Sequence, residues 1–250
     1  SLKQERKDTI LMFRERAGYS PQLNNSVEKQ QLLDTLERFK KAPFKIALQK
    51  DGELTQISKH IFAEELGIVV PERTPKERRL VDVSPDGIYG YVHARNKDIC
   101  GLVARGDVDI AVVGSDRVFE SKLGDKVVTV SEYDGTDEWK WPIVIATAET
   151  ADITDLSQIR SVATQYPEIA GQFFEEMGHE VAIIQSSGGT EAYPHIGVDA
   201  IIDLTSTGAS LEANGLTKWE PAIFTVSPVM IVNPESMDKY VQQKNFYEQN

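Results

Sequence analysis

Two turns rich in small and hydroxyl-bearing residues lie within residues 183–216, and each stands between an apolar segment and the start of a helix pattern. The second turn follows Val198–Leu204, an apolar run with two aspartates that is typical of a buried strand ending in an acid. Residues 205–210 read Thr-Ser-Thr-Gly-Ala-Ser. Leu211, Ala213 and Leu216 then give a short apolar stripe, so a helix is expected to begin there. The order of strand, tight turn and helix favours an α/β fold.

Residues 205–210 also suit an anion. Backbone N–H groups at a helix start, together with the positive end of the helix dipole, attract phosphate, and Gly208 allows a phosphate to approach closely. Asp203 would not favour the phosphate, but it suits hydroxyl groups that donate to it, such as those of ribose. The pattern therefore indicates a sugar phosphate. The alternative is an ordinary strand, turn and helix, since Ser and Thr are common capping residues.

The rest of the chain from Phe44 alternates between strand and helix patterns, which predicts a mostly parallel sheet with helices on both faces. Strands are expected at 44–48, 78–81, 88–94, 109–114, 142–148, 161–163, 222–226 and 229–232. Helices are expected at 55–66, 98–104, 155–159 and 167–177. Residues 1–43 predict two helices instead, one ending at Gly18 and one capped by Asn25 or Ser26, which are too short to bury their own apolar stripes.

Composition excludes several classes of protein. The net charge of −12 argues against a nucleic-acid partner or an anionic membrane surface, since both attract basic patches, but small anionic substrates need only a local site. The single cysteine, Cys100, forms no intrachain disulfide and is expected to be a buried thiol. We find no cleavable signal and no membrane-spanning apolar run, which predicts a cytoplasmic protein. The four histidines have no metal-ligand spacing and join no recognisable catalytic triad.

Several segments resemble one known family. Asp203 and the residues after it follow the order acid, Leu, two residues, Thr-Gly, one residue, Ser/Thr, Leu and then Asn-Gly-Leu, which resembles the phosphoribosyl pyrophosphate loop of ATP phosphoribosyltransferases. Ser187–Glu191 is similar to that family's glycine and glutamate turn, and Ala163–Pro167 is similar to its "AT, x, YP" turn. A further series matches the family's spacing without a gap: Arg95, Asp98, Gly106, Asp109, Gly114, Asp116 and Glu120.

The resemblance covers residues 44–233 and implies a fold, an activity and partners. The fold is the two-lobed type II periplasmic-binding-protein fold, here with an N-terminal helical extension at 1–43, lobe I at 44–137 plus 222–250, and lobe II at 138–221. The activity is the first step of histidine biosynthesis, in which ATP and phosphoribosyl pyrophosphate, with Mg²⁺, give N1-(5-phosphoribosyl)-ATP and pyrophosphate. The implied partners are further copies of the chain and, as in the family's short form without a C-terminal regulatory domain, a regulatory subunit related to histidyl-tRNA synthetase.

The resemblance also implies residue roles. The loop of Thr205, Ser206, Thr207, Gly208, Ala209 and Ser210 would hold the 5′-phosphate, and Asp203 the ribose hydroxyls. Arg95 and Lys50, with Arg79, would supply catalytic or binding cations to the pyrophosphate or the ATP phosphates. Glu191, Tyr166 and Asp116 would complete the substrate-binding cleft. Structural alternatives remain open: Arg95 in a surface ion pair with Asp98, and Lys50 and Glu191 in solvated turns.

Two segments depart from the family pattern. Lys50–Glu53 reads Lys-Asp-Gly-Glu where the family usually has Lys-Gly-Arg, so Glu53 replaces a basic residue expected near the pyrophosphate. Trp139–Pro142 stands where the family has a glycine, cysteine, arginine strand. Two rival functions therefore remain: a non-catalytic solute-binding or regulatory protein on the same fold, and a catalytically weak paralogue acting as a partner subunit. The Asp203–Leu211 loop argues against the first, since an amino-acid receptor has no reason to carry it.

Overall fold

The computed structural model describes residue 4 and residues 27–73 and 79–249, and its contacts divide the chain into residues 1–37 and 38–250. The first predicted helix and the predicted caps of the second, Asn25 and Ser26, lie outside the described residues. The second predicted helix is α2 (Val27–Lys41). Within the second unit, Arg38 at the end of α2 donates through Nη2 to the carbonyl oxygens of Ser84 and Pro85 at 2.9 and 2.7 Å.

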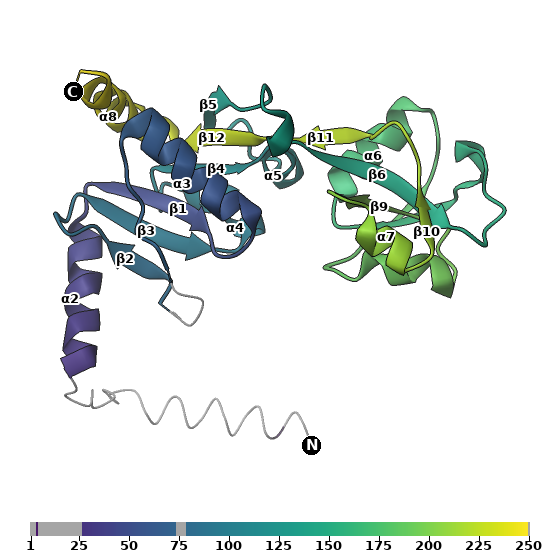
Figure 1. Cartoon of the computed structure of the whole chain (residues 1–250), viewed down its shortest axis with the longest axis horizontal. Helices are drawn as coiled ribbons and strands as arrows, with labels where there is room; N and C mark the ends of the chain where they lie inside the picture. The colour runs from purple at the N-terminus through teal and green to yellow at the C-terminus, as the bar shows by residue number, and fades with distance from the viewer. Residues whose placement is uncertain (1–3, 5–26, 74–78, 250) are drawn as a thin grey trace. The chain divides into compact units, whose positions relative to one another are not determined.

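One sheet of six strands forms the part of the chain that we call lobe I (Figure 1). Its strand order is β2-β3-β1-β4-β12-β5. β1 runs parallel to β3 and to β4, while the other three pairs of the sheet are antiparallel. The strands are β1 (Phe44–Gln49), β2 (Val81–Val83), β3 (Tyr89–Ala94), β4 (Ile110–Gly114), β5 (Val128–Glu132) and β12 (Pro228–Val232).

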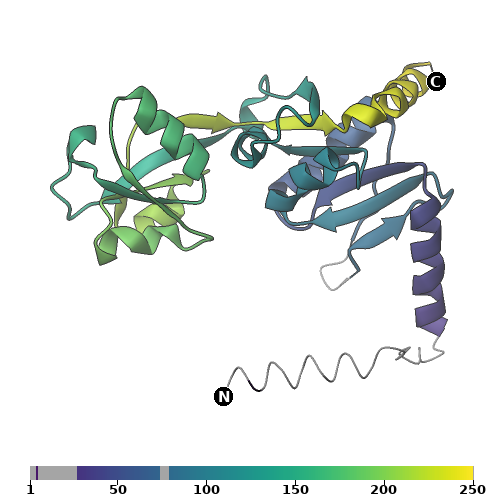
Figure 2. The same ribbon diagram turned by 180° about the vertical axis from the view of Figure 1, so that it is seen from behind.

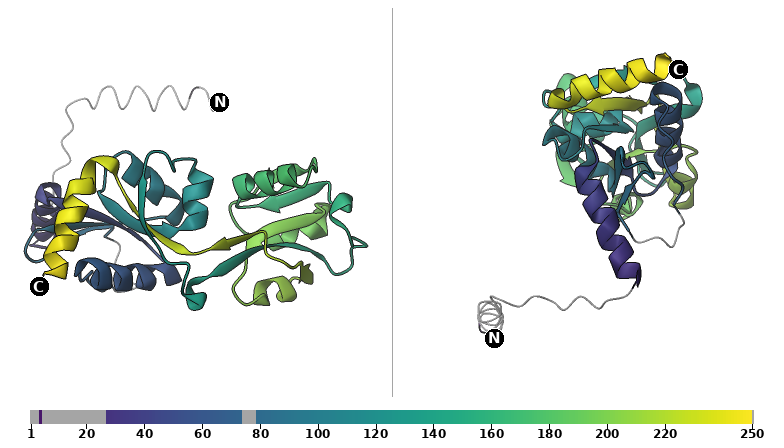
Figure 3. Two further views of the ribbon diagram at one scale, coloured as in Figure 1. Left: turned by 90° about the horizontal axis from the view of Figure 1, so that it is seen from above. Right: turned by 90° about the vertical axis from the view of Figure 1, so that its left-hand side faces the viewer.

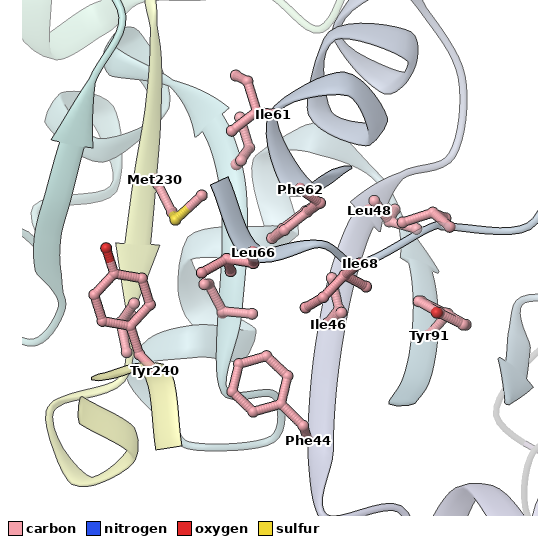
Figure 4. Close-up of a cluster of buried hydrophobic side chains, with 14 of the residues drawn as sticks. Phe44, Ile46, Leu48, Ile61, Phe62, Leu66, Ile68, Tyr91, Met230 and Tyr240 are labelled. Carbon is pink, nitrogen blue, oxygen red and sulfur yellow. The ribbon is translucent and has the colours of Figure 1, made fainter. Parts of the chain in front are cut away.

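Helices cover both faces of this sheet because β1 alternates between them. Ile46 and Leu48 join one buried cluster with Phe62 of α3 (Glu53–Leu66) and with α8 (Met237–Glu248), as Figure 4 shows. Ala47 joins the opposite cluster with Ile99 of α4 (Asn96–Ala104), the helix on the side seen in Figure 2. The period of two that defines a strand therefore sets both layers.

A second sheet forms lobe II, with the order β10-β6-β9-β7-β8 and β11 also paired to β6. β7 runs parallel to β8 and β9, whereas β6 runs antiparallel to β9, β10 and β11. Two helices, α6 (Pro167–Glu176) and α7 (Ala209–Ala213), pack on opposite faces (Figure 3). The strands are β6 (Trp141–Ala148), β7 (Ser161–Thr164), β8 (Ala182–Gln185), β9 (Ala200–Leu204), β10 (Leu216–Lys218) and β11 (Phe224–Val226).

The prediction of a mostly parallel sheet is wrong, because both sheets contain parallel and antiparallel pairs. A parallel neighbour requires a helical crossover, and such crossovers join only some of the strands. The chain instead enters lobe II along β6 and returns to lobe I along β11 and β12. Because the return runs in the opposite direction, β11 is antiparallel to β6, and β12 is antiparallel to β4 and β5. β11 also pairs with β6 of lobe II, although residues 222–226 were expected with the first lobe.

Several elements lack a strong sequence signal. Sequence patterns missed β5, β10, α8 and the seven-residue α5 (Ser115–Ser121). α8 has a weak signal because Tyr240 is its one buried residue. The helix expected near 155–159 is a 3-10 turn. The 3-10 turns are η1 (Asp137–Trp139), η2 (Leu156–Gln158), η3 (Thr190–Ile196) and η4 (Pro234–Ser236).

The parallel strands place the predicted site residues at the carboxyl edges of the two sheets. In lobe I this edge holds the residues that follow β1, β3 and β4. In lobe II it holds the residues that follow β7, β8 and β9. Open α/β sheets bind ligands at this edge, where the helices begin.

Candidate functional site

The loop of residues 205–210 is folded by its own hydroxyl groups. The backbone N–H of Gly208 donates to Thr205 Oγ1 at 2.9 Å, and that of Ala209 donates to Thr207 Oγ1 at 3.3 Å. Gly208 has a φ of 79°, which a residue with a Cβ rarely adopts. Ser206, Thr207, Ala209 and Ser210 are exposed. The helix expected after the loop is α7, which has only five residues, and Leu216 of the expected stripe lies in β10.

Asp203 lies at the end of β9, immediately before this loop. Its Oδ1 accepts a hydrogen bond from the backbone N–H of Leu204 at 2.8 Å. Burial, with a smaller contribution from the charge of Glu191, raises the pKa of Asp203 above its ordinary value. The Leu204 N–H and the Thr190 side chain oppose this shift of the pKa, and a ligand that donates a further hydrogen bond would favour the ionised carboxylate in the same way.

Glu191 connects the neighbouring turn to the same loop. Its Oε1 accepts a hydrogen bond from the hydroxyl of Ser210. η3, which carries Glu191, begins after Gly189, whose φ of 62° is left-handed. The alternative of a merely solvated turn does not describe Glu191, because its carboxylate is bound to the loop.

The predicted cations of lobe I lie at the carboxyl edge of the first sheet. Lys50 follows β1 and is exposed, and Arg95 follows β3 and is also exposed. Within the described residues no ion pair joins Arg95 to Asp98, whose backbone N–H donates to the Arg95 carbonyl at 2.9 Å. Arg79 is farther away, since it precedes β2, and β3 and β1 separate β2 from β4.

Asp116 and Tyr166 meet through Arg117, a residue that sequence patterns did not single out. Asp116 Oδ2 lies 2.8 Å from Arg117 Nε, and the Arg117 guanidinium carbon lies 4.8 Å from the centre of the Tyr166 ring. Burial is the main reason that the pKa values of Asp116 and Tyr166 are raised, while the Arg117 charge opposes both shifts. The available signal was position, because Arg117 directly follows the acid at the end of a buried strand.

Glu120 makes a second connection between the lobes. Its carboxylate accepts hydrogen bonds from the backbone N–H groups of Glu168 and Ile169, at 3.2 and 2.8 Å, in the first turn of α6. A carboxylate at a helix N-terminus satisfies donors that have no partner inside the helix. Lys122 adds an ion pair of 2.8 Å with Glu168.

Two cavities open beside these residues. The larger, of about 750 Å³, is lined from lobe I by Arg95, Lys97 and Glu120 and from lobe II by residues that include Gln165 and Ser186. The smaller, of about 230 Å³, has among its lining residues Gln49, Glu53, Asp116, Tyr166, Leu204 and Ser206. Arg117 and Asn96 line both cavities. The structure thus brings together Arg95, Asp116, Tyr166 and the start of the 205–210 loop.

Other sequence predictions concern the rest of the molecule. Cys100 is 1% exposed, and burial raises the pKa of its thiol to about 11, as expected for an unreactive core residue. Residues 27–73 and 79–249 contain no group of three or more His, Cys, Asp or Glu side chains placed to hold a metal. No helix in the same ranges has the length and apolar character needed to cross a membrane.

The chain matches the family model described as ATP phosphoribosyltransferase over residues 95–249. An ATP phosphoribosyltransferase from Listeria monocytogenes serotype 4a is 33% identical over 195 residues, which cover 77% of this chain and 87% of the relative. One from Clostridium novyi is 34% identical over 196 residues, covering 77% of this chain and 89% of the relative.

Solved structures share the fold. The ATP phosphoribosyl transferase (HisG:HisZ) complex from Thermotoga maritima contains a chain with a TM-score of 0.62 and 21% identity, covering 81% of this chain and 96% of that one. Tv2483 bound to L-arginine gives a TM-score of 0.51 at 14% identity, covering 82% and 84%. These similarities confirm the predicted two-lobed α/β fold.

Proposed function

The chain belongs to the ATP phosphoribosyltransferase family, and we propose that it joins ATP and phosphoribosyl pyrophosphate to N1-(5-phosphoribosyl)-ATP and pyrophosphate. This reaction is the first step of histidine biosynthesis. The observation that carries the proposal is one continuous structure in lobe II. Asp203 at the end of β9 leads directly into the hydroxyl-rich loop, and Ser210 of that loop donates a hydrogen bond to Glu191. Such a site matches a sugar phosphate, with an acceptor for hydroxyl groups at one end and N–H and hydroxyl donors at the other.

In this proposal the loop of residues 205–210 binds the 5′-phosphate and Asp203 accepts hydrogen bonds from the ribose hydroxyls. Glu191 holds the loop through Ser210 and also faces the sugar. The exposed hydroxyls of Ser206 and Thr207 supply donors that do not depend on the short helix α7. These roles are supported by the contacts within lobe II.

Positive charge for the pyrophosphate and for the ATP phosphates comes from lobe I. Arg95 lines the larger cavity, and Lys50 follows β1 at the same edge of the first sheet, while Arg79 lies farther along that edge, before β2. N1 of adenine already has a lone pair, so no strong general base is required. Catalysis then consists of positioning the two substrates and stabilising charge on the leaving pyrophosphate and at C1 of the sugar.

We also propose Mg²⁺ as the metal of the reaction. The carboxylates of Asp203 and Glu191 at the edge of the loop are oxygen donors of the kind that Mg²⁺ prefers, and a cation there would relieve the buried charge of Asp203. Mg²⁺ usually binds through one or two carboxylates together with substrate phosphates, which fits this small donor set. When bound, it supplies charge neutralisation for the pyrophosphate.

The structural relative from Thermotoga maritima is a HisG:HisZ complex. We propose by analogy that this chain forms homo-oligomers and also binds a regulatory chain. The rival function, a non-catalytic partner subunit, is favoured by one observation: the acidic Glu53 lines the smaller cavity, where the resemblance leads one to expect a base.

An absorbance assay tests the proposal. Purified chain is mixed with ATP, phosphoribosyl pyrophosphate, Mg²⁺ and a pyrophosphatase, and ultraviolet absorbance is followed, because adenine substituted at N1 absorbs differently from ATP. A rise that requires both substrates is expected, and Asp203→Ala should abolish it. Asp152→Ala is the matched control, since Asp152 is an exposed aspartate of the same lobe.

Two other results would count against the proposal. Binding of phosphoribosyl pyrophosphate in calorimetry without any absorbance rise would favour the partner-subunit function. Absence of both binding and turnover would overturn the assignment of the site.

A further inference from the structure

We propose that Arg117 is a further substrate-binding residue, which contacts a diphosphate or triphosphate group of the substrate with the free end of its guanidinium. This inference rests on the proposed function and gives a role to a residue of the candidate site that the proposed function leaves without one. Arg117 lies where β4 ends and α5 begins, at the carboxyl edge of the first sheet. Its side chain is 16% exposed, so the charge is largely shielded from water.

Two neighbours fix the guanidinium. Asp116, whose side chain is 4% exposed, forms the ion pair with Nε, and the guanidinium carbon lies over the ring of Tyr166. Asp116 belongs to lobe I and Tyr166 to lobe II, so the orientation of Arg117 depends on both lobes. A cation held in this way loses little further freedom when it binds a ligand.

Arg117 has N–H groups that its contacts with Asp116 and Tyr166 do not use. A guanidinium has five N–H groups in a planar fork. Nε lies 2.8 Å from Asp116 Oδ2 as an ion pair but makes no hydrogen bond of good geometry, and the guanidinium carbon lies 4.8 Å from the centre of the Tyr166 ring. The two Nη groups carry four N–H groups, more than the single Tyr166 hydroxyl could accept. This end of the fork has the geometry that binds two phosphate oxygens together.

Location argues for a phosphate ligand. Arg117 lines both cavities, and it shares the larger one with Arg95 and Lys97, which are exposed. The smaller cavity contains Glu53 in place of the expected basic residue. Arg117 therefore brings a positive charge to the same cavity from a different strand end.

The experiment compares Arg117→Gln and Arg117→Lys with Arg105→Gln, whose exposed side chain pairs with Asp107 on the surface. Isothermal calorimetry is run with inorganic pyrophosphate, with phosphoribosyl pyrophosphate and with ATP separately, and KM and kcat are measured for both substrates. Arg117→Gln is expected to weaken binding of at least one phosphate ligand by roughly 10- to 100-fold, since hydrogen bonds to charged groups contribute about 1.5–3 kcal/mol. The affinity of Arg117→Lys should lie between those of Arg117→Gln and the wild type, because lysine keeps the positive charge but has no planar fork of N–H groups. Arg105→Gln should change neither the affinity for these ligands nor the values of KM and kcat.

The ligands distinguish the two sources of phosphate. Weaker binding of pyrophosphate and phosphoribosyl pyrophosphate alone would assign Arg117 to that substrate, and weaker binding of ATP alone would assign it to the triphosphate. Tyr166→Leu, which removes the ring that lies beside Arg117, should weaken binding of the same ligand that Arg117→Gln weakens.

Folding is controlled separately. If Arg117→Gln leaves Asp116 unpaired and does not fold, Asp116→Asn combined with Arg117→Gln removes both buried charges, and it is compared with Asp116→Asn alone because Asp116 itself lines the smaller cavity. Unchanged affinity for all three ligands in a folded Arg117 variant, with Asp203→Ala still losing phosphoribosyl pyrophosphate, would overturn this inference and leave the proposed function standing. Absence of ligand binding by the wild type would overturn both.

Discussion

Asp109 offers the sharpest test of what the structure says about stability. This residue is 7% exposed and lies at the start of β4. Its Oδ2 accepts from the backbone N–H of Lys45 at 2.6 Å, and its Oδ1 accepts from the Ser236 hydroxyl at 2.5 Å and from Lys239 Nζ at 2.8 Å. One carboxylate therefore ties β1 and β4 to the chain around α8.

Asp109→Ala removes the acceptor and leaves two enclosed donors, the Lys45 N–H and the Ser236 hydroxyl. Each buried donor without a partner costs about 1–3 kcal/mol, so we expect a loss of about 4 kcal/mol in the free energy of unfolding. Lys239 adds little because its side chain is 48% exposed. For a chain of this size about 4 kcal/mol corresponds to a fall in Tm of roughly 8–16 °C.

Urea denaturation followed by circular dichroism measures this loss. Asp107→Ala is the matched control, because Asp107 pairs with Arg105 on the surface and should cost less than about 1 kcal/mol. Asp109→Asn keeps one acceptor oxygen, so its loss of stability should lie between those of Asp107→Ala and Asp109→Ala. Turnover per folded molecule should not change, since Asp109 lies at the opposite end of β4 from Asp116. Equal stability of the Asp109→Ala and Asp107→Ala variants, or a loss of turnover without loss of stability, would refute this reasoning.

Two further predictions concern the loop. Burial raises the pKa of Asp203, so its contribution to stability is present below the unfolded value of about 3.9 and is lost as pH rises through the folded pKa. Asp203→Asn should therefore gain stability relative to the wild type between roughly pH 4 and pH 7, as urea denaturation at both values would reveal, and an unchanged difference would contradict the role of burial. Gly208→Ala adds a Cβ that meets no atom within 4 Å, so its effect should come from the φ of 79° alone and cost about 1–2 kcal/mol. Calorimetry should show weaker phosphoribosyl pyrophosphate binding for Gly208→Ala than for Gly135→Ala, a glycine with equally open surroundings, and equal affinity would count against a rigid loop.

Sequence patterns predicted the elements that bury an apolar face. β4 and β9 were expected from continuous apolar runs, because burial selects such patterns. α6 was expected from the spacing of Ile169, Phe173 and Met177, but the helix buries Ile169 and Phe174 and leaves Met177 53% exposed. α8 and β10 could not be predicted in this way, since α8 buries little and β10 has only three residues. Strand direction was also inaccessible, because local composition does not say whether a strand follows a helical crossover or a passage between lobes.

In the candidate site, sequence patterns predicted the residues of a contiguous motif and missed a residue whose environment comes from a distant part of the chain. The Asp203 loop was visible because its residues are contiguous, and a contiguous motif needs no knowledge of distant contacts. Arg117 was missed because its environment comes from Tyr166, which lies 49 positions later in the chain. The spaced series from Arg95 to Glu120 mixed two kinds of residue: Asp116 lines a cavity, whereas Asp109 holds β1 and β4 to the end of the chain. Spacing alone does not separate structural acids from those of a site.

The position of β12 has a consequence for biosynthesis. Residues 228–232 form the strand between β4 and β5 in the first sheet, so β4 and β5 become neighbours of a common strand only after all of lobe II has been translated. Residues 141–226 supply every strand of the second sheet, so lobe II can fold while it leaves the ribosome. The first lobe to be synthesised is thus the last to be completed, and until then the backbone edge of β4 that β12 later covers is open to chaperones and to neighbouring chains.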